Sequence, residues 1–313
     1  WFFAVVSLWL ITVFGSYLPH MFADHWSKMN NDEEMPTKNH MMERPEAKEQ
    51  DFHVQLSGEV IPNKPSDLFI QLHDSSGKPI TDLQISHERI LHVILVSEDL
   101  EEFLHVHPED NPSNREYDLA GYGIQVKLTK AGRYRVLVDA SRKSSGEVSD
   151  TVWVNVGIDE DSSGEPVFIK KDLRLNRIFK EYDVSLQLSP QNPPKSGDKT
   201  QLSYFIRDRK NGNPIFDIEQ YLGADIHLAV MPIDLAIIVH THGVIWVPPD
   251  NPNAGISFPE IRANYIFPYP GIWKMYGQFK HQGKVVTTDF MVEVAAGDLE
   301  NKMMAPHMDD NGH

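Results

Sequence analysis

The sequence predicts an all-β protein built of two tandem antiparallel β-sandwich domains. Short runs of β-branched and aromatic residues alternate with Gly, Pro, Asn and Asp, and convincing helical periodicity is absent. A chain of 313 residues has room for about two domains. Duplication is also indicated by a histidine pattern, H-x12-H-x-H, which occurs twice at an offset of 135 residues.

The chain starts with an uncharged apolar segment. Residues 1–14 read WFFAVVSLWLITVF, and the uncharged stretch extends to Ala23. The shorter run fits the hydrophobic region of a signal peptide, whereas the longer stretch would serve as a short membrane anchor. We therefore predict that residues 1–23 are a signal peptide or membrane anchor of an exported bacterial protein, either secreted or held at the membrane. Residues 24–50 lack an apolar period, which predicts a disordered linker containing Met and His.

Two further regions share one order of strands and turns. The turn DSSGKPI at 74–80 corresponds to RKNGNPI at 209–215. Later, AGRYRVLVD at 131–139 matches PGIWKMYGQF at 270–279, and each match places an aromatic residue after a turn glycine, as in Ig-like sandwiches. We predict Ig-like domains at 51–157 and 179–296, a linker at 158–178, and a disordered tail containing Met and His at 297–313.

Composition excludes several classes of function. Acidic residues outnumber basic ones by 45 to 29, and the net charge of −16 argues against binding to nucleic acid, which needs a basic surface. The chain has no cysteine, so disulfides, thiolate metal sites and cysteine nucleophiles are excluded. The sequence contains no phosphate-binding loop, dinucleotide fingerprint, nucleophile elbow or zincin motif.

The histidine patterns lie in predicted β-hairpins. Residues 91–108 contain an apolar strand, an acidic turn and a second apolar strand. Side chains alternate between the two faces of a strand, so His105 and His107 share a face. With the turn centred at 98–99, His92 lies directly across from His105 and shares this face. Three imidazoles could then converge on one ion with bonds of about 2 Å.

We predict that both triads bind metal. An all-nitrogen site suits copper or zinc, and copper is favoured because it binds such ligands more tightly and is available to an exported protein. Met and His residues interspersed near both ends of the chain, a donor set suited to copper(I), also favour copper. Structural histidines, which a duplication would copy as well, are the alternative interpretation. The predicted ligands are His92, His105, His107, His227, His240 and His242.

Two segments resemble a known bacterial family. The segment HVILVSEDLEEFLHVHP at 92–108 is similar to a motif of YtkA-like extracytoplasmic β-sandwich domains, and residues 275–294 are similar to their closing hairpin. The resemblance implies a secreted or membrane-anchored module associated with copper handling or metalloprotein assembly. The second repeat departs from the motif at residues 231–233 and at Gly243, so the resemblance implies less there.

Together these observations predict an exported copper-binding protein that acts as a chaperone, buffer or sensor. Its expected partners are the metal ion, another metalloprotein or a membrane protein, and the membrane itself through the N-terminal segment. One alternative is a non-metal extracellular interaction module whose Ig-like domains need histidines only for structure. The other is a copper-dependent enzyme, but nothing near the triads suggests a general base.

Overall fold

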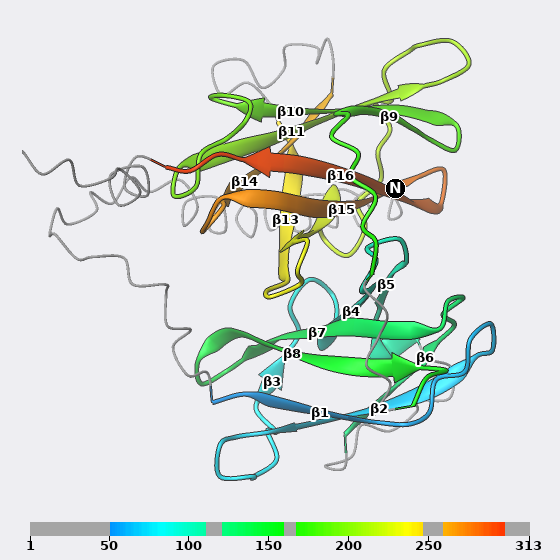
Figure 1. The fold of residues 1–313 in the computed structure, drawn as a ribbon, viewed down its shortest axis with the longest axis vertical. Coiled ribbons are helices and arrows are strands. Elements are labelled where there is room, and N and C mark those ends of the chain that lie inside the picture. The colour runs from blue at the N-terminus through cyan, green and yellow to red at the C-terminus, as the bar shows by residue number, and fades with distance from the viewer. Residues whose placement is uncertain (1–50, 111–120, 160–166, 247–258, 298–313) are drawn as a thin grey trace, which may run out of the picture. The chain divides into compact units, whose positions relative to one another are not determined.

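Two antiparallel β-sandwiches make up the part of the chain that the computed structural model describes, which is residues 51–110, 121–159, 167–246 and 259–297 (Figure 1). Both lie within one compact unit, Gln50–His313. The prediction of an all-β protein with two tandem Ig-like sandwiches is confirmed. The predicted signal or anchor segment, the N-terminal linker and nearly all of the predicted tail lie outside the described residues. Among the residues described, no helix combines the length and hydrophobicity that a membrane crossing requires.

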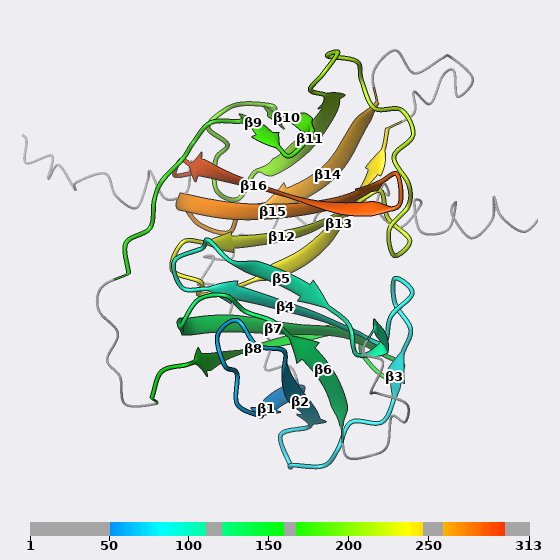
Figure 2. The ribbon, with the colours of Figure 1, turned by 90° about the vertical axis from the view of Figure 1, so that its right-hand side faces the viewer.

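The first sandwich has a three-stranded and a five-stranded sheet, which face each other across a core (Figure 2). The smaller sheet has the order β1 (His53–Ser57), β2 (Ser66–His73), β6 (Tyr122–Val126). In the larger sheet, β7 (Gly132–Arg142) pairs with β3 (Leu83–Gln84), β4 (Leu91–Ser97) and β8 (Gly146–Val156). The strand β5 (Phe103–Val106) pairs with β4 and is followed by a short 3-10 helix, η1 (Pro108–Asp110).

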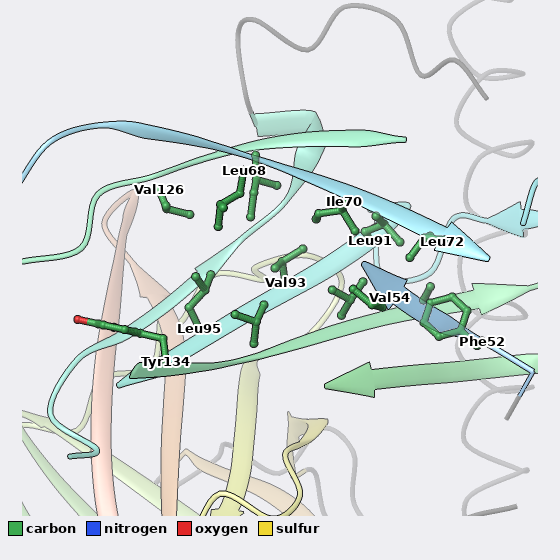
Figure 3. Close-up of a cluster of buried hydrophobic side chains, with 14 of the residues drawn as sticks. Phe52, Val54, Leu68, Ile70, Leu72, Leu91, Val93, Leu95, Val126 and Tyr134 are labelled. Atoms are coloured by element: carbon green, nitrogen blue, oxygen red, sulfur yellow. The ribbon is translucent and has the colours of Figure 1, made fainter. Parts of the chain in front are cut away.

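Alternation of buried and exposed residues explains why β2 covers the core with one face only. Leu68, Ile70 and Leu72 are buried, and the residues between them are exposed. Figure 3 shows these side chains gathered with Leu91 and Val93 of β4. The first core therefore lies between the two sheets, as expected for a sandwich.

Within the described residues, the second sandwich also has eight named strands, with β9 added and no named strand equivalent to β3, and its strands form one continuous path of pairs. That path has the order β16-β15-β12-β13-β14-β11-β10-β9. It is continuous because β13 pairs with β12 through Gly243 and then with β14 from Val244. The strands are β9 (Asn176–Phe179), β10 (Tyr182–Ser189), β11 (Lys199–Asp208), β12 (Ile226–Pro232), β13 (Val239–Ile245), β14 (Glu260–Ile266), β15 (Gly271–His281) and β16 (Lys284–Val294).

Two local features of this repeat bear on the sequence predictions: the role of Gly243 and the start of β9. Gly243 is required where β13 changes partner, because a Cβ there would lie 2.7 Å from the side chain of Ile226 and 2.9 Å from the backbone oxygen of Arg262. The strand β9 begins at Asn176, so its first three residues fall within the range 158–178 predicted as a linker. It pairs with β10 and therefore belongs to the second sandwich.

The strands β4 and β12 are buried on both faces. Every residue of each strand is buried. Alternate residues of β4, such as Val93 and Leu95, join the first core, whereas Ile94 and Val96 join a third apolar cluster that draws on both repeats. We call this third group the apolar interface cluster. Its buried members are Ile94, Val96, Leu100, Leu137, Ala229, Met231, Leu235, Ile238, Tyr276 and Met291.

Replacement of Tyr276 by Phe is expected to destabilise the chain by about 1–3 kcal/mol. The Tyr276 hydroxyl donates a buried hydrogen bond of 2.5 Å to the backbone oxygen of Leu100, which belongs to the other repeat. Its loss leaves that oxygen without this donor. Urea unfolding measures the change. The matched control is Tyr204→Phe, because the Tyr204 hydroxyl is buried and has no hydrogen-bond partner among the described residues. Equal stability of both variants would contradict the prediction.

Candidate metal centre

The two predicted hairpins form, but their register differs from the prediction. His105 lies opposite Ile94, not opposite His92. In the second repeat, His227 lies opposite His242 rather than His240. Both pairings are shifted by two residues from those expected.

The turns explain this correction. Leu100 has a positive φ of 59° and its side chain is 1% exposed in the apolar interface cluster. Its burial centres the turn at 99–100, one residue later than predicted. Leu235 takes the equivalent place in the second hairpin, with a φ of 54°. Moving a turn by one residue shifts the pairing by two, so each histidine stays on the predicted face.

The three predicted ligands of the first repeat bring their ring nitrogens together, and we call them the first triad. His92 comes from β4 and His105 from β5, and His107 follows directly after β5. The Nε2 atom of His105 lies 3.3 Å from Nδ1 of His92 and 3.2 Å from Nε2 of His107. The three ligand atoms lie within 4.8 Å of one another, and all three residues are buried. Two nitrogens bound tetrahedrally at about 2.0–2.1 Å from a metal are roughly 3.3 Å apart, so the spacing fits.

Hydrogen bonds to oxygen fix the tautomer of each ring in this first triad. His92 donates from Nε2 to the backbone oxygen of Ser86 at 3.1 Å. His105 donates from Nδ1 to the side-chain oxygen of Gln278 at 3.0 Å. His107 donates from Nδ1 to Asp110 at 2.8 Å. A carbonyl or carboxylate oxygen accepts only, so in the neutral rings all three inward nitrogens carry lone pairs. Three lone pairs that face one another need a cation or a proton between them.

The second hairpin contributes a different set. Nδ1 of His227 lies 3.1 Å from Nε2 of His240, and Nε2 of His227 donates to the backbone oxygen of Tyr221 at 2.7 Å. The third residue that approaches this pair is His92 of the first repeat, and the three ligand atoms lie within 4.8 Å of one another. We call His92, His227 and His240 the inter-repeat triad.

His242 is adjacent to the inter-repeat triad but is not part of it. Its ring centroid lies 4.5 Å from that of His227 and 3.7 Å from that of His87, on which it stacks. Its Nε2 atom is buried and has no hydrogen-bond partner among the described residues. The residue equivalent to Asp110 is Ile245, so the second repeat has no carboxylate three residues after its last histidine.

Each repeat supplies a hydrogen-bond acceptor to the central histidine of the other. Gln278 of β15 accepts from His105, and Asp139 of β7 accepts from Nδ1 of His240 at 3.0 Å. These acceptors occupy equivalent positions, because Asp139 pairs with His92 and Gln278 pairs with His227 in the neighbouring strands. The two hairpins therefore form one histidine cluster that extends across both repeats.

Burial keeps the histidines of this cluster neutral. It lowers the pKa of His92 to about 4 and that of His227 to about 3. The pKa values of His105 and His240 lie well below the ordinary value, first through burial and then through the neighbouring imidazoles. Burial also raises the pKa of Asp139 to about 6. Near pH 7 the imidazoles are thus in the uncharged form that binds metal ions.

Comparison with known families places the two repeats in one group. Residues 47–157 and 178–296 match a family described as "Domain of unknown function (DUF8832)". The chain belongs to the DUF8832 family. Each match contains one sandwich with its histidine hairpin, so the chain carries two DUF8832 units in tandem. No curated protein matches the chain.

Solved structures similar to this pair of DUF8832 units include two-domain segments of other proteins. The fibronectin(III)-like modules of CbhA from Clostridium thermocellum share 9% identity, with coverage of 78% of this chain and 95% of that chain and a TM-score of 0.20. A two-domain fibronectin type III segment of chicken tenascin shares 8%, with coverage of 77% and 98% and a TM-score of 0.21. Domains 5–6 of the S-layer protein SbsC share 14%, with coverage of 78% and 97% and a TM-score of 0.21. Likeness at these TM-scores carries no functional argument.

Sequence reasoning missed several residues of the histidine cluster. It did not single out Asp139, Gln278 or Asp110 as acceptors, nor the stacking of His87 on His242. A signal existed for two of them, since Asp139 and Gln278 fall in the matched segments 131–139 and 270–279. They lie one strand away from the histidines, so only a correct strand order would have placed them at the site.

Proposed function

We propose that this protein is an exported metal-binding protein whose first triad, His92, His105 and His107, holds a copper ion, with zinc as the second choice. The observation that carries the proposal is the arrangement of the three inward nitrogens. They face one another at 3.2–3.3 Å from His105, while every outward nitrogen donates to an oxygen. Such acceptors orient metal-binding histidines and fix their tautomer in known metal sites.

The donor set and its burial support a role in holding metal. Three neutral imidazoles suit both copper and zinc, and copper forms the tighter complexes with nitrogen ligands. The resemblance of residues 92–108 to YtkA-like domains supports copper and export, because it implies a secreted or membrane-anchored module associated with copper handling. Because the three residues are buried, a bound ion would be shielded from solvent. Shielding favours a chaperone or buffer over an enzyme, which needs an open coordination position.

Metal analysis of the full chain, purified without a polyhistidine tag, tests the proposal. After loading with copper(II) or zinc and extensive dialysis, the wild type should retain metal. In competition with a chelator of known affinity, the double variant His105→Gln/His107→Gln should bind the ion at least about 10-fold more weakly than the wild type. The matched control is His53→Gln/His73→Gln, a stacked pair 5.7 Å apart on β1 and β2. If the wild type retains no metal, or if the His105/His107 variant binds it as tightly as the wild type, the proposal fails.

Removal of the acceptor for His107 is expected to weaken metal binding by about 10–100-fold. The variant is Asp110→Ala, which removes the oxygen that accepts from Nδ1 of His107 and leaves that ring free to turn or change tautomer. The Asp110 side chain is 51% exposed, so folding should be little affected. Asp110→Asn is the control, because its amide oxygen can still accept. Competition with a chelator of known affinity measures both constants, and equal affinities for wild type and Asp110→Ala would contradict the expected role.

A further inference from the structure

His92 belongs to two groups of histidines at once. It completes the first triad with His105 and His107, and it completes the inter-repeat triad with His227 and His240. Its ring centroid lies 5.5 Å from that of His105 and 4.8 Å from that of His240. The two groups are therefore neighbouring positions that meet at one ring.

That ring has a single nitrogen to offer to a metal. Nε2 of His92 donates to the backbone oxygen of Ser86, so only Nδ1 carries a lone pair in the neutral ring. The histidine that links the two positions can then bind an ion in only one of them at a time. Two cations held this close in a buried site would also repel each other strongly.

We infer that the two repeats form one centre for a single metal ion, which has two positions: the first triad and the inter-repeat triad. This inference rests on the proposed function, because it assumes that the histidine cluster binds a cation, and it adds the stoichiometry and the ligands. It departs from the sequence prediction of two independent sites, because His242 is not a ligand at either position.

The hydrogen bonds across the interface support a shared centre. His105 is held by Gln278 of the second repeat, and His240 is held by Asp139 of the first. Each position thus has a ligand oriented by the opposite repeat, and neither repeat completes the centre alone. The apolar interface cluster supports the contact between the hairpins that bear these histidines.

A shared ligand gives the ion a route between the repeats. An ion on His92 can exchange His105 and His107 for His227 and His240 without leaving the cluster. Bonds break and form one at a time, and the ion keeps its charge. Such a two-position centre suits a protein that passes an ion on. In the second position the ion also links the two sandwiches directly.

Titration of the full chain with zinc or copper(II) tests the inference, counting only the binding that His92→Gln abolishes. Ions lost only in the double variant His92→Gln/His227→Gln, which disrupts every combination of these histidines, are counted as well, so a second and separate ion in the cluster would be seen. We expect one ion per chain. His107→Gln, which disrupts only the first triad, should weaken binding but retain one ion. The double variant His107→Gln/His240→Gln should lose both positions and bind at least about 100-fold more weakly than His107→Gln alone. The matched control, His107→Gln/His242→Gln, should bind like His107→Gln.

The outcomes separate this inference from the proposed function. If the wild type binds no ion that depends on His92, both fail. If it binds two ions, one lost with His107→Gln and the other with His242→Gln, the proposed function stands and the shared centre is refuted. The same conclusion follows if His240→Gln adds nothing to the loss caused by His107→Gln. Thermal unfolding of every variant without metal shows whether a loss of binding reflects a loss of folding.

Discussion

Saturation with copper(II) or zinc is expected to raise the midpoint of thermal unfolding by roughly 5–10 °C. An ion that binds only the folded state stabilises it by about 2.7 kcal/mol when its free concentration is 100 times the dissociation constant. For a chain of this size, each kcal/mol corresponds to about 2–4 °C. The ligands of the first triad meet only when β4 and β5 are paired, so the unfolded chain offers no comparable site. Differential scanning calorimetry at several metal concentrations gives the shift and its dependence on concentration.

The variants that lack first-triad ligands show where the shift arises. In His105→Gln/His107→Gln the rise should shrink markedly, whereas His53→Gln/His73→Gln should respond like the wild type. An equal rise in all three chains would mean that the ion stabilises the protein from elsewhere, and the prediction would then be wrong. Because the inter-repeat triad draws ligands from both sandwiches, we also expect metal to make their unfolding more cooperative, which sharpens the calorimetric transition.

The sequence was sufficient to place three histidines on one face of each hairpin. Side chains repeat with period two along a strand, so His105 and His107 share a face whatever the register. The turn lies one residue later than predicted, which shifted the pairing by two residues and changed the partner of His92 but not its face. The face that a strand residue occupies can therefore be predicted more safely than the pairing register. The register depended on the positive φ and the burial of Leu100.

The periodicity of the strands could not predict that the two hairpins pack together and share one histidine cluster. A local pattern shows which face a side chain occupies, but not what covers that face. One clue was present, because residues 91–96 and 226–231 are almost continuously apolar, as in strands that are buried on both sides. Their second faces pack in the apolar interface cluster, between the repeats. Reading these runs as doubly covered strands would have predicted a partner surface next to the histidines.

Acidification of the metal-free chain from pH 7 to pH 5 is expected to lower its free energy of unfolding by several kcal/mol. His92 and His227 have pKa values of about 4 and about 3 in the folded chain, against about 6.5 when unfolded. The unfolded state therefore binds protons below pH 6.5 that the folded state does not. By linkage, stability falls as the pH drops through this window, and each of the two residues contributes a loss of about 2 kcal/mol at pH 5.

The other buried groups modify this loss in known directions. His105 and His240 have lowered pKa values too, so they add to the effect. Asp139 opposes it, because burial raises its pKa from 3.8 to about 6, and its protonation as the pH falls restores about 1 kcal/mol. Asp225, whose pKa burial also raises, acts in the same direction as Asp139. The histidines with lowered pKa values outnumber these two carboxyl groups, so the net change is destabilising. Urea unfolding at pH 7 and pH 5 measures it, and His227→Gln should reduce the difference by about 2 kcal/mol.

The same pKa values predict how the metal-bound chain responds to acid. Protons compete poorly for His92 and His227 while the chain is folded, because burial disfavours the charged imidazolium. Between pH 6.5 and about pH 4, acid therefore acts mainly by favouring the unfolded state, which has lost the site and whose free imidazoles are protonated. Metal release should then occur at the same pH as the change in tryptophan fluorescence, which includes the exposure of the fully buried Trp273. Release of the ion well above the pH of unfolding would show that the folded imidazoles are protonated readily, contrary to their burial in the cluster.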